Sequence, residues 1–240
     1  MIGVSAFAES FQTAVSLVLH ADPVLLRTVG LSLLVSTSAC AIAAGFGLVS
    51  GAWLAVTSFP GRRALIALLT TLLALPSVVV GLVVYLLLSR SGPLGAWGIL
   101  FTPGAMVIAQ TILVLPVIAA LSRQLVADSL RDGGDQLRSM GAPPLTAALL
   151  MLVHERWALV TILLTAFGRA ISEVGAVMIV GGNIDGVTRV ITTTIALETS
   201  KGDLPLALAL GMVLLALVGF VNVAISVAQR AQGATPALAR

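Results

Sequence analysis

Long uncharged stretches alternate with short polar segments along this chain. No charged residue occurs in 28–61, 64–89 or 91–122, and a further uncharged apolar stretch covers 204–227. A helix needs roughly 20 apolar residues to cross the hydrocarbon core of a bilayer, and each stretch is long enough. With 58% hydrophobic and 10% charged residues, the composition is also far from that of a water-soluble domain. The pattern predicts an all-α, polytopic helical membrane protein.

Turn-forming residues divide the chain into five expected core transmembrane helices, at residues 28–57, 64–89, 104–122, 157–180 and 204–228. The fourth is expected to end at Gly181-Gly182-Asn183, because Gly and Asn accept the left-handed conformation that closes helices. A short surface helix is expected near 188–199. The hydroxyls of Thr192–Thr194 would either cap that helix or line an outer vestibule.

The two ends of the chain are expected to flank one transmembrane domain that covers residues 1–240. Residues 1–27 place Glu9, Gln12 and His20 among apolar positions, which is typical of an amphipathic helix lying in the membrane interface. A sixth, short span is the alternative for this segment. Residues 229–240 form a polar tail.

One polar segment, Arg123–Pro144, separates the third apolar stretch from the fourth and is too charged to cross a bilayer. Its middle reads Asp135, Gln136, Leu137, Arg138, Ser139, Met140 and Gly141. An acid is favoured at a helix start, and Gly suits a helix end. With Pro143-Pro144 following, the pattern predicts a short helix, a turn and a second helix. Such an element either docks into another protein or is an ordinary solvated connector.

The positive residues predict the orientation. If the 123–156 region is cytoplasmic, that side collects Arg62, Arg63, Arg123, Arg131, Arg138, Arg156, Arg230 and Arg240. The other side holds Arg27, Arg90, Arg189 and Lys201. Cytoplasmic loops carry the excess of Lys and Arg in membrane proteins. The N-terminus is therefore expected outside and the C-terminus in the cytoplasm.

Two ionisable residues fall inside the fourth expected span. Arg169 and Glu173 are four residues apart, so on a continuous helix they share one face and form an ion pair. Intramembrane charges mark functional positions by default. The pair is either a structural contact between helices or subunits, or part of a gate. The full set of gate or pathway candidates is Pro76, Pro116, Arg169, Glu173, Gly175, Gly182 and Asn183.

Each remaining candidate has a physical reason. Pro76 and Pro116 each remove a backbone donor in mid-span and are expected to bend their helices. Gly175 and Gly182 allow backbones to approach closely. In both cases plain packing is the alternative to a role in the pathway.

Several function classes are excluded by what the sequence lacks. There is no G-x-x-x-x-G-K-[ST] phosphate loop, so the chain is not expected to bind ATP itself. No Ser/His or HExxH arrangement of a hydrolase occurs, and we do not expect an enzyme. His20 and His154 lie on opposite sides of the expected membrane, and the single cysteine, Cys40, lies within a span, so neither a metal site nor a disulfide is expected. The net charge of +3 reflects arginines at helix ends and does not indicate nucleic-acid binding.

The polar segment resembles the EAA loop of ABC importer permeases, whose pattern is E-A-A-x-x-x-G. Here the acid Asp135 and the glycine Gly141 match, while both alanines are replaced. The Leu-Pro that commonly follows in this family is replaced by His154-Glu155. The resemblance implies that residues 135–141 seat in an ATP-binding subunit.

A second resemblance is to the permeases for molybdate, tungstate and sulfate. It rests on Leu75–Gly81, on Arg169–Ala176 and on Gly181–Ile184, and covers residues 25–228. The continuation ISEVGAVMIVGGN…TRVITTTIALETSKGD is most similar to tungstate permeases.

This second resemblance implies a permease subunit of a prokaryotic inner-membrane importer. Two copies would form the pathway in lipid, ATP and Mg would bind the partner ATPases, and an external binding protein would deliver the oxyanion. An ion-coupled secondary transporter or a channel acting without an ATPase is the alternative.

Overall fold

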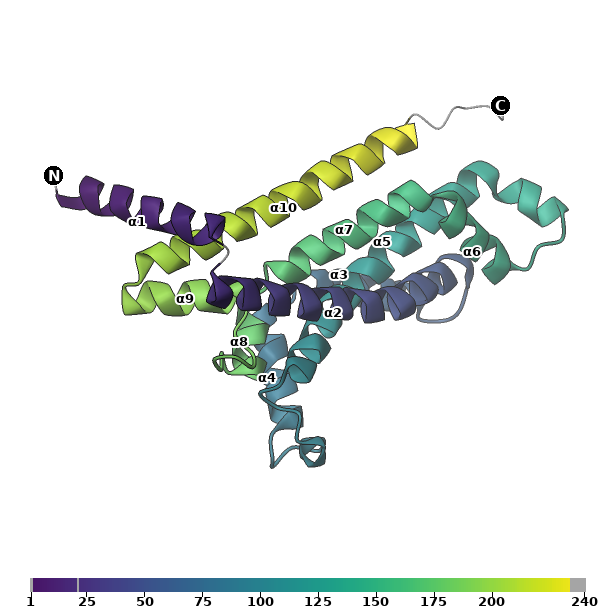
Figure 1. The fold of residues 1–240 in the computed structure, drawn as a ribbon. Helices are drawn as coiled ribbons and strands as arrows, with labels where there is room; N and C mark the ends of the chain where they lie inside the picture. Colours follow the sequence, from purple (N-terminus) through teal and green to yellow (C-terminus); the bar gives the residue numbers. More distant parts are fainter. Residues whose placement is uncertain (1, 21, 234–240) are drawn as a thin grey trace. The chain divides into compact units, whose positions relative to one another are not determined.

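Helices make up all the regular structure of the described chain. The computed structural model describes residues 2–20 and 22–233, and Figure 1 shows only coiled ribbons joined by loops. The elements are α1 (Ile2–Leu19), α2 (Pro23–Val56), α3 (Arg62–Leu73), α4 (Ser77–Leu88), the 3₁₀ turn η1 (Gly95–Trp97), α5 (Pro103–Ser139), α6 (Pro144–His154), α7 (Arg156–Ile171), α8 (Gly175–Gly181), α9 (Ile191–Lys201) and α10 (Leu204–Gly233). The predicted all-α class is confirmed.

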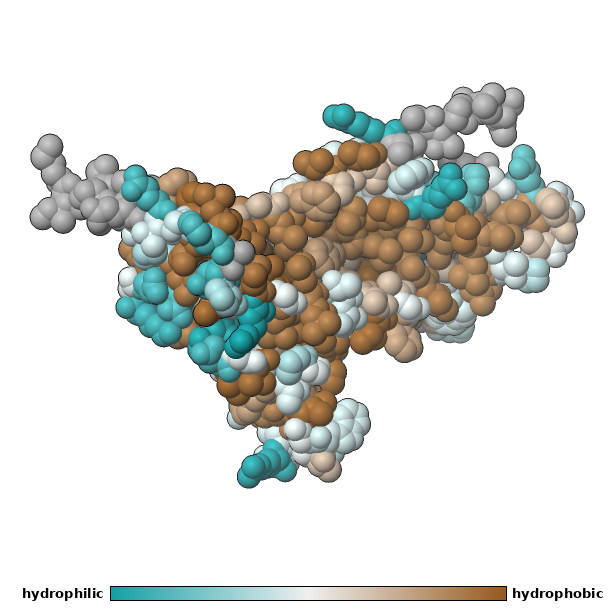
Figure 2. All heavy atoms as spheres, in the orientation of Figure 1, coloured by the Kyte–Doolittle hydropathy of each residue, from teal (hydrophilic) through white to brown (hydrophobic). Residues whose placement is uncertain are grey.

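The number of apolar spans agrees with the sequence. Helices α2, α5 and α10 are each long and apolar enough to cross a membrane, and the total is five if each of the bent pairs α3–α4 and α6–α7 counts as one span. Apolar residues dominate the face shown in Figure 2. Large side chains such as Phe46, Leu215 and Phe220 are more than 60% exposed, as expected of surface that lipid or another subunit covers.

The N-terminal boundary was predicted less well. Helix α2 begins at Pro23, five residues before the predicted start at Thr28, because the Asp22 carboxylate accepts hydrogen bonds from the Val24 and Leu25 N–H groups and caps the helix. Helix α1 agrees with the expected N-terminal helix, while its position at the membrane interface stays a prediction. It does not qualify as a span among the described residues, where only its stretch Ser10–Leu19 counts as a short apolar helix.

The two mid-span prolines behave differently. At Pro76 the expected bend is a complete break, because α3 ends at Leu73 and α4 begins only at Ser77. Pro disfavours helical geometry in the residue before it. Helix α5 instead continues through Pro116.

The polar segment is more helical than predicted. Helix α5 runs on to Ser139, well past the predicted end at Ser122. The stretch after Ser122 is rich in good helix formers such as Leu, Gln, Arg and Ala. The helix can therefore continue beyond the apolar part of the sequence. Residues 123–139 are therefore the continuation of α5 and not the separate short helix that the sequence predicted.

The expected fourth span, 157–180, was also wrong as one helix. Its place is taken by α7, which meets α6 at an angle of 80°, and by the separate short helix α8. The predicted surface helix is α9, whose Thr192, Thr193 and Thr194 are buried rather than exposed. Helix α10 reaches Gly233, so the predicted tail from 229 starts as helix, and its last residues, 234–240, lie outside the described chain.

The chain divides into two compact units, and α2, α5 and α10 contribute residues to both. One unit contains the chain up to Ser38, Pro76–Gln110 and Ile171–Phe220. Its core joins α1, α2, α9 and α10 through Ala14, Leu25, Ile191, Ala209 and Leu210. The other contains Ala39–Leu75, Thr111–Ala170 and the chain from Val221. Its core joins α2, α5 and α7 through Cys40, Ala43, Val114, Ile118, Ile162, Ala166 and Ala170.

Candidate functional site

The end of α5 forms the tip of a helix–turn–helix in the second unit. Ala142 N–H donates to the Leu137 carbonyl at 3.1 Å, and Gly141 has φ +76°, so the helix closes through a left-handed residue. The predicted role of Gly141 as a helix end is confirmed. Asp135 lies near the end of α5 and not at a helix start, so the expected acidic helix start was wrong.

Helix α6 then leads the chain back from this turn. Pro144 occupies its first turn, where a missing N–H costs nothing. One face of α6 is buried: Ala148 and Leu152 pack with Ala52 of α2 and Val126 of α5. The turn between α5 and α6 is thus held on a fixed base while Met140, at its tip, is 81% exposed.

Apolar side chains stay exposed around this turn. Besides Met140, the α6 residues Leu150 and Val153 are 50% and 72% exposed. A groove of about 560 Å³ lies between the end of α5 and α6 and is lined by Gln136, Leu137, Leu150, Met151, His154 and Glu155 among others. Exposed apolar groups of this kind are typical of surface that lipid or another protein covers.

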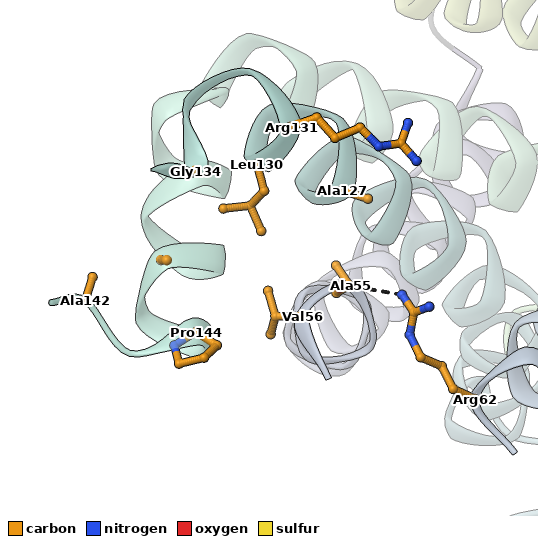
Figure 3. A pocket seen from close by; sticks show the side chains of 10 residues that line it. Ala55, Val56, Arg62, Ala127, Leu130, Arg131, Gly134, Ala142 and Pro144 are labelled. Atoms are coloured by element: carbon orange, nitrogen blue, oxygen red, sulfur yellow. Dashed lines mark hydrogen bonds between the residues drawn. The ribbon is translucent and has the colours of Figure 1, made fainter. Parts of the chain in front are cut away.

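A second pocket, of about 390 Å³, lies between the end of α2, α5 and the start of α6 (Figure 3). Val56, Leu130 and Pro144 contribute apolar groups, and Arg62 and Arg131 contribute guanidinium groups. Arg62 is already engaged, because its Nε donates to the Leu54 carbonyl at 3.0 Å and its Nη2 to that of Ala55 at 3.4 Å. It therefore caps the C-terminus of α2 and ties the start of α3 to it.

Five gate candidates lie around α8 in the first unit. Glu173 and Gly175 lie at its start, Gly182 and Asn183 follow its end, and Pro76 directly precedes the neighbouring helix α4. Helices α4 and α8 pack against each other. A Cβ placed on Gly175 would lie 2.7 Å from Val78 Cγ2 and 3.0 Å from Ser77 Oγ, so the side chains at the start of α4 would have to shift to admit any other residue.

Glu173 has a different role from the predicted one. Helix α7 ends at Ile171, so Glu173 is not on the helix that carries Arg169, and the expected shared face is lost. Instead Glu173 Oε1 accepts a hydrogen bond from Ala176 N–H at 3.3 Å, which caps the first turn of α8. Thr192 Oγ1 of α9 donates to the Glu173 carbonyl at 2.7 Å.

The end of α8 is equally constrained. Gly182 and Asn183 have φ +69° and +50°, which confirms the predicted helix end. Asn183 Nδ2 donates to the Thr193 carbonyl at 3.4 Å, and Phe101 N–H donates to the Val180 carbonyl at 3.0 Å. Helix α8 is therefore fixed to α9 at both ends.

Arg169 and Pro116 do not belong to the α8 cluster, the group of Pro76, Glu173, Gly175, Gly182 and Asn183 described above. Arg169 lies on α7 with an exposed side chain, and Pro116 is buried within α5. Both belong to the second unit.

Sequence reasoning missed four polar residues next to Glu173. Ser32 and Ser36 of α2, Gln110 of α5 and Thr192 are buried and line a small cavity of about 10 Å³ with Glu173, the volume of about one water molecule. Ser32 Oγ accepts from Ile191 N–H at 2.8 Å and so ties α2 to α9. The available signal was the spacing of Ser32 and Ser36 by four residues within an apolar span.

The described residues hold no group of three or more His, Cys, Asp or Glu side chains suited to a metal ion. The arrangement is thus one of helix ends, hydroxyls and close packing.

Comparison with known proteins gives a consistent result. No protein-family model matches the chain. It is 43% identical over 222 residues to the tungstate uptake system permease protein TupB of Peptoclostridium acidaminophilum, covering 91% of this chain and 96% of that one. It is 45% identical to a probable anion ABC transporter permease of Haloferax volcanii (82% and 88% covered) and 36% identical to TupB of Campylobacter jejuni (86% and 87% covered). Relatives named as a sulfate permease and a molybdenum permease are more distant, at 32% and 29% identity.

Proposed function

The chain belongs to the permease subunits of ABC transporters, and we propose on this basis that it is the membrane-spanning subunit of a tungstate importer. The identity of 43% over 91% of the chain with a tungstate permease supports this substrate most directly. The lower identity with the sulfate and molybdenum permeases makes those oxyanions second candidates.

Two copies of the chain would form the pathway, with two ATP-binding subunits below them and an external binding protein above. The subunit uses the α5–α6 turn, residues 135–141, to receive the movement of the ATPase. Three observations support this role: the turn is exposed at Met140, anchored through Ala148 and Leu152, and flanked by a groove that contains Gln136 and Leu137. Such a rigid base transmits a push on the turn into α2 and α5.

The orientation follows from the arginine distribution. The turn, Arg62 and Arg230 face the cytoplasm, while Arg27 and Arg189 face outside. The gate lies at the α8 cluster, where Glu173 and Gly175 hold α8 against α4 and α9. Pro76, Pro116 and Arg169 stay candidates for hinges or pathway residues.

Uptake into proteoliposomes tests the proposal. The permease is reconstituted with its ATPase, and the binding protein is added outside with tungstate, molybdate or sulfate. We expect uptake of tungstate that requires both ATP and the binding protein, and that excess molybdate or sulfate inhibits weakly.

The matched control contains the permease alone with imposed proton or sodium gradients. Uptake driven by a gradient without the ATPase would favour the secondary-transporter alternative. Equal ATP-driven uptake of molybdate would contradict the assignment to tungstate alone.

Replacements of Glu173 distinguish two effects at the proposed gate: loss of the hydrogen bond that caps α8 and loss of the negative charge. Glu173→Gln retains an oxygen that can accept from Ala176 N–H, whereas Glu173→Ala does not. Loss of a helix cap costs about 1 kcal/mol, so we expect Glu173→Ala to reduce the uptake rate by about fivefold and Glu173→Gln to keep most of it. The measurement is initial uptake at equal complex concentration.

The control for this pair is Asp203→Ala, which removes a cap of the same kind at the start of α10, where Asp203 Oδ1 accepts from Leu206 N–H at 3.3 Å. This variant should lower stability without the same loss of uptake. A loss in Glu173→Gln as large as in Glu173→Ala would show that the charge, and not the cap, matters.

A further inference from the structure

A small basic pocket occupies the end of the first unit that contains the start of α2. Its volume is about 170 Å³, and it is lined by Arg27 and Thr28 of α2 and by Asp185, Gly186 and Arg189 of the loop between α8 and α9, with two apolar side chains. Pockets for larger organic ligands generally exceed 300 Å³. This one suits a small ion.

Two guanidinium groups meet at this pocket. Arg189 is only 18% exposed and its Nη1 lies 3.1 Å from Asp185 Oδ1. Its Nε is buried without a hydrogen-bond partner among the described residues. A buried charged donor without an acceptor is costly, so this N–H indicates an acceptor that binds from the pocket.

Arg27 reaches the same loop from α2. Its Nη1 lies 3.7 Å from the position a Cβ would have on Gly186, which has φ +69°. No carboxylate among the described residues pairs with Arg27, because nearby Asp22 is bonded to the N–H groups at the start of α2. The pocket therefore has two positive charges against the single carboxylate of Asp185.

That carboxylate is weakly held. Asp185 is 77% exposed, and exposed ion pairs contribute little stability, so an incoming anion can displace it from Arg189. The loop itself is fixed: Thr188 Oγ1 donates to the Gly181 carbonyl at 2.6 Å and accepts from Ile184 N–H at 2.9 Å. The two arginines are thus presented by a preformed frame.

We propose that Arg27 and Arg189 form an oxyanion acceptor site at the outer mouth of the permease, which receives the tetrahedral dianion when the binding protein releases it. Guanidinium groups bind such oxygens in pairs of parallel hydrogen bonds. The site is separate from the α8 gate and from the predicted role of Arg169. The inference rests on the proposed function for the orientation and for the substrate.

Direct binding tests the site. The permease–ATPase complex in lipid nanodiscs, without binding protein, is dialysed against tungstate, and bound tungsten is measured by mass spectrometry. Arg27→Gln and Arg189→Gln should each weaken binding about tenfold, since each removes charged hydrogen bonds. Asp185→Asn should strengthen binding about threefold, because it removes the competing carboxylate. A misfolded protein would not show that gain.

Arg90→Gln is the matched control, since Arg90 is an exposed arginine on the same expected side and outside the pocket. It should bind tungstate as the wild type does. Equal binding by all variants, or an equal loss in Arg90→Gln, would overturn the site. ATP-driven uptake by the wild type separates the two proposals: if it persists while the pocket variants bind normally, only this inference fails. If the wild type takes up none of the three oxyanions, the proposed function fails.

Discussion

Gly81→Leu is expected to abolish uptake and to destabilise the permease. Gly81 is buried on α4, where this helix crosses α8. A Cβ placed on it would lie 2.7 Å from Ala176 Cα and 3.1 Å from the Ala176 carbonyl oxygen. These atoms belong to backbone, so no side-chain rotation can relieve the clash, and α8 must move away from α4.

Graded substitutions give this prediction its magnitude. Overpacking of a tight contact costs about 1–3 kcal/mol. We therefore expect Gly81→Ala to lower the Tm of the purified complex by roughly 5 °C and to slow uptake, while Gly81→Leu has no measurable uptake. The Tm is measured by size-exclusion chromatography after heating, and uptake is measured by the proteoliposome assay.

Gly45→Ala supplies the control. Gly45 also lies within a membrane helix, α2, but a Cβ on it would meet no atom within 4 Å. Ala favours the helix over Gly, so this variant should be as stable as the wild type or more stable. Unchanged stability and uptake in Gly81→Ala would show that α4 and α8 do not pack as closely as described.

The apolar spans were predictable because each is a long run of apolar residues without charge, and such a run can be seen in the sequence alone. Runs without charge located both ends of α2, the end of α4 and the starts of α5 and α10 to within five residues. The polar end of α5 was not predictable in this way, because residues 123–139 combine charge with good helix formers. Hydropathy reports where a helix leaves the membrane and not where it stops.

The breaks were harder to predict because they depend on packing. Pro76 and Pro116 follow the same Leu-Pro pattern, yet only the first ends a helix. Pro116 lies between Val114 and Ile118, which are buried in the core with α2 and α7, and this packing favours an unbroken helix. The Arg169–Glu173 pair failed for the same reason: spacing by four residues predicts contact only on a continuous helix.

The pocket formed by Arg27 and Arg189 could not be predicted from the sequence. Arg27 and Arg189 are separated by most of the chain, and in the sequence each looks like an ordinary charged residue at the end of a helix. Only the fold of the 182–190 loop brings them together. The turn at Gly141, in contrast, was found from local residues, since left-handed helix ends depend on a short motif.

Gly141→Val is expected to uncouple the permease from its ATPase. A β-branched residue at φ +76° is strained by about 1–3 kcal/mol, and the strain is relieved when the Ala142–Leu137 hydrogen bond breaks. The turn that presents Met140 then changes shape. We expect loss of ATP-driven uptake, and loss of the increase in ATPase rate that we expect tungstate-loaded binding protein to cause in the wild type.

Two further variants separate shape from other effects. Gly141→Asn tolerates the left-handed conformation, so it should retain most of the coupling. Gly202→Val imposes a similar strain at the end of α9, where Gly202 has φ +84° and open space around a Cβ. It should lower stability by a similar amount and leave the ATPase response intact.

The ATPase response is the decisive readout because it separates coupling from folding. If Gly141→Val assembles with the ATPase and still responds to the loaded binding protein, the α5–α6 turn is not the coupling element. If Gly202→Val loses the response to the same extent, the effect belongs to any weakened helix end. Loss in Gly141→Val alone, with recovery in Gly141→Asn, would assign the coupling to the shape of this one turn, because the two variants differ in the backbone conformation they tolerate and not in their position.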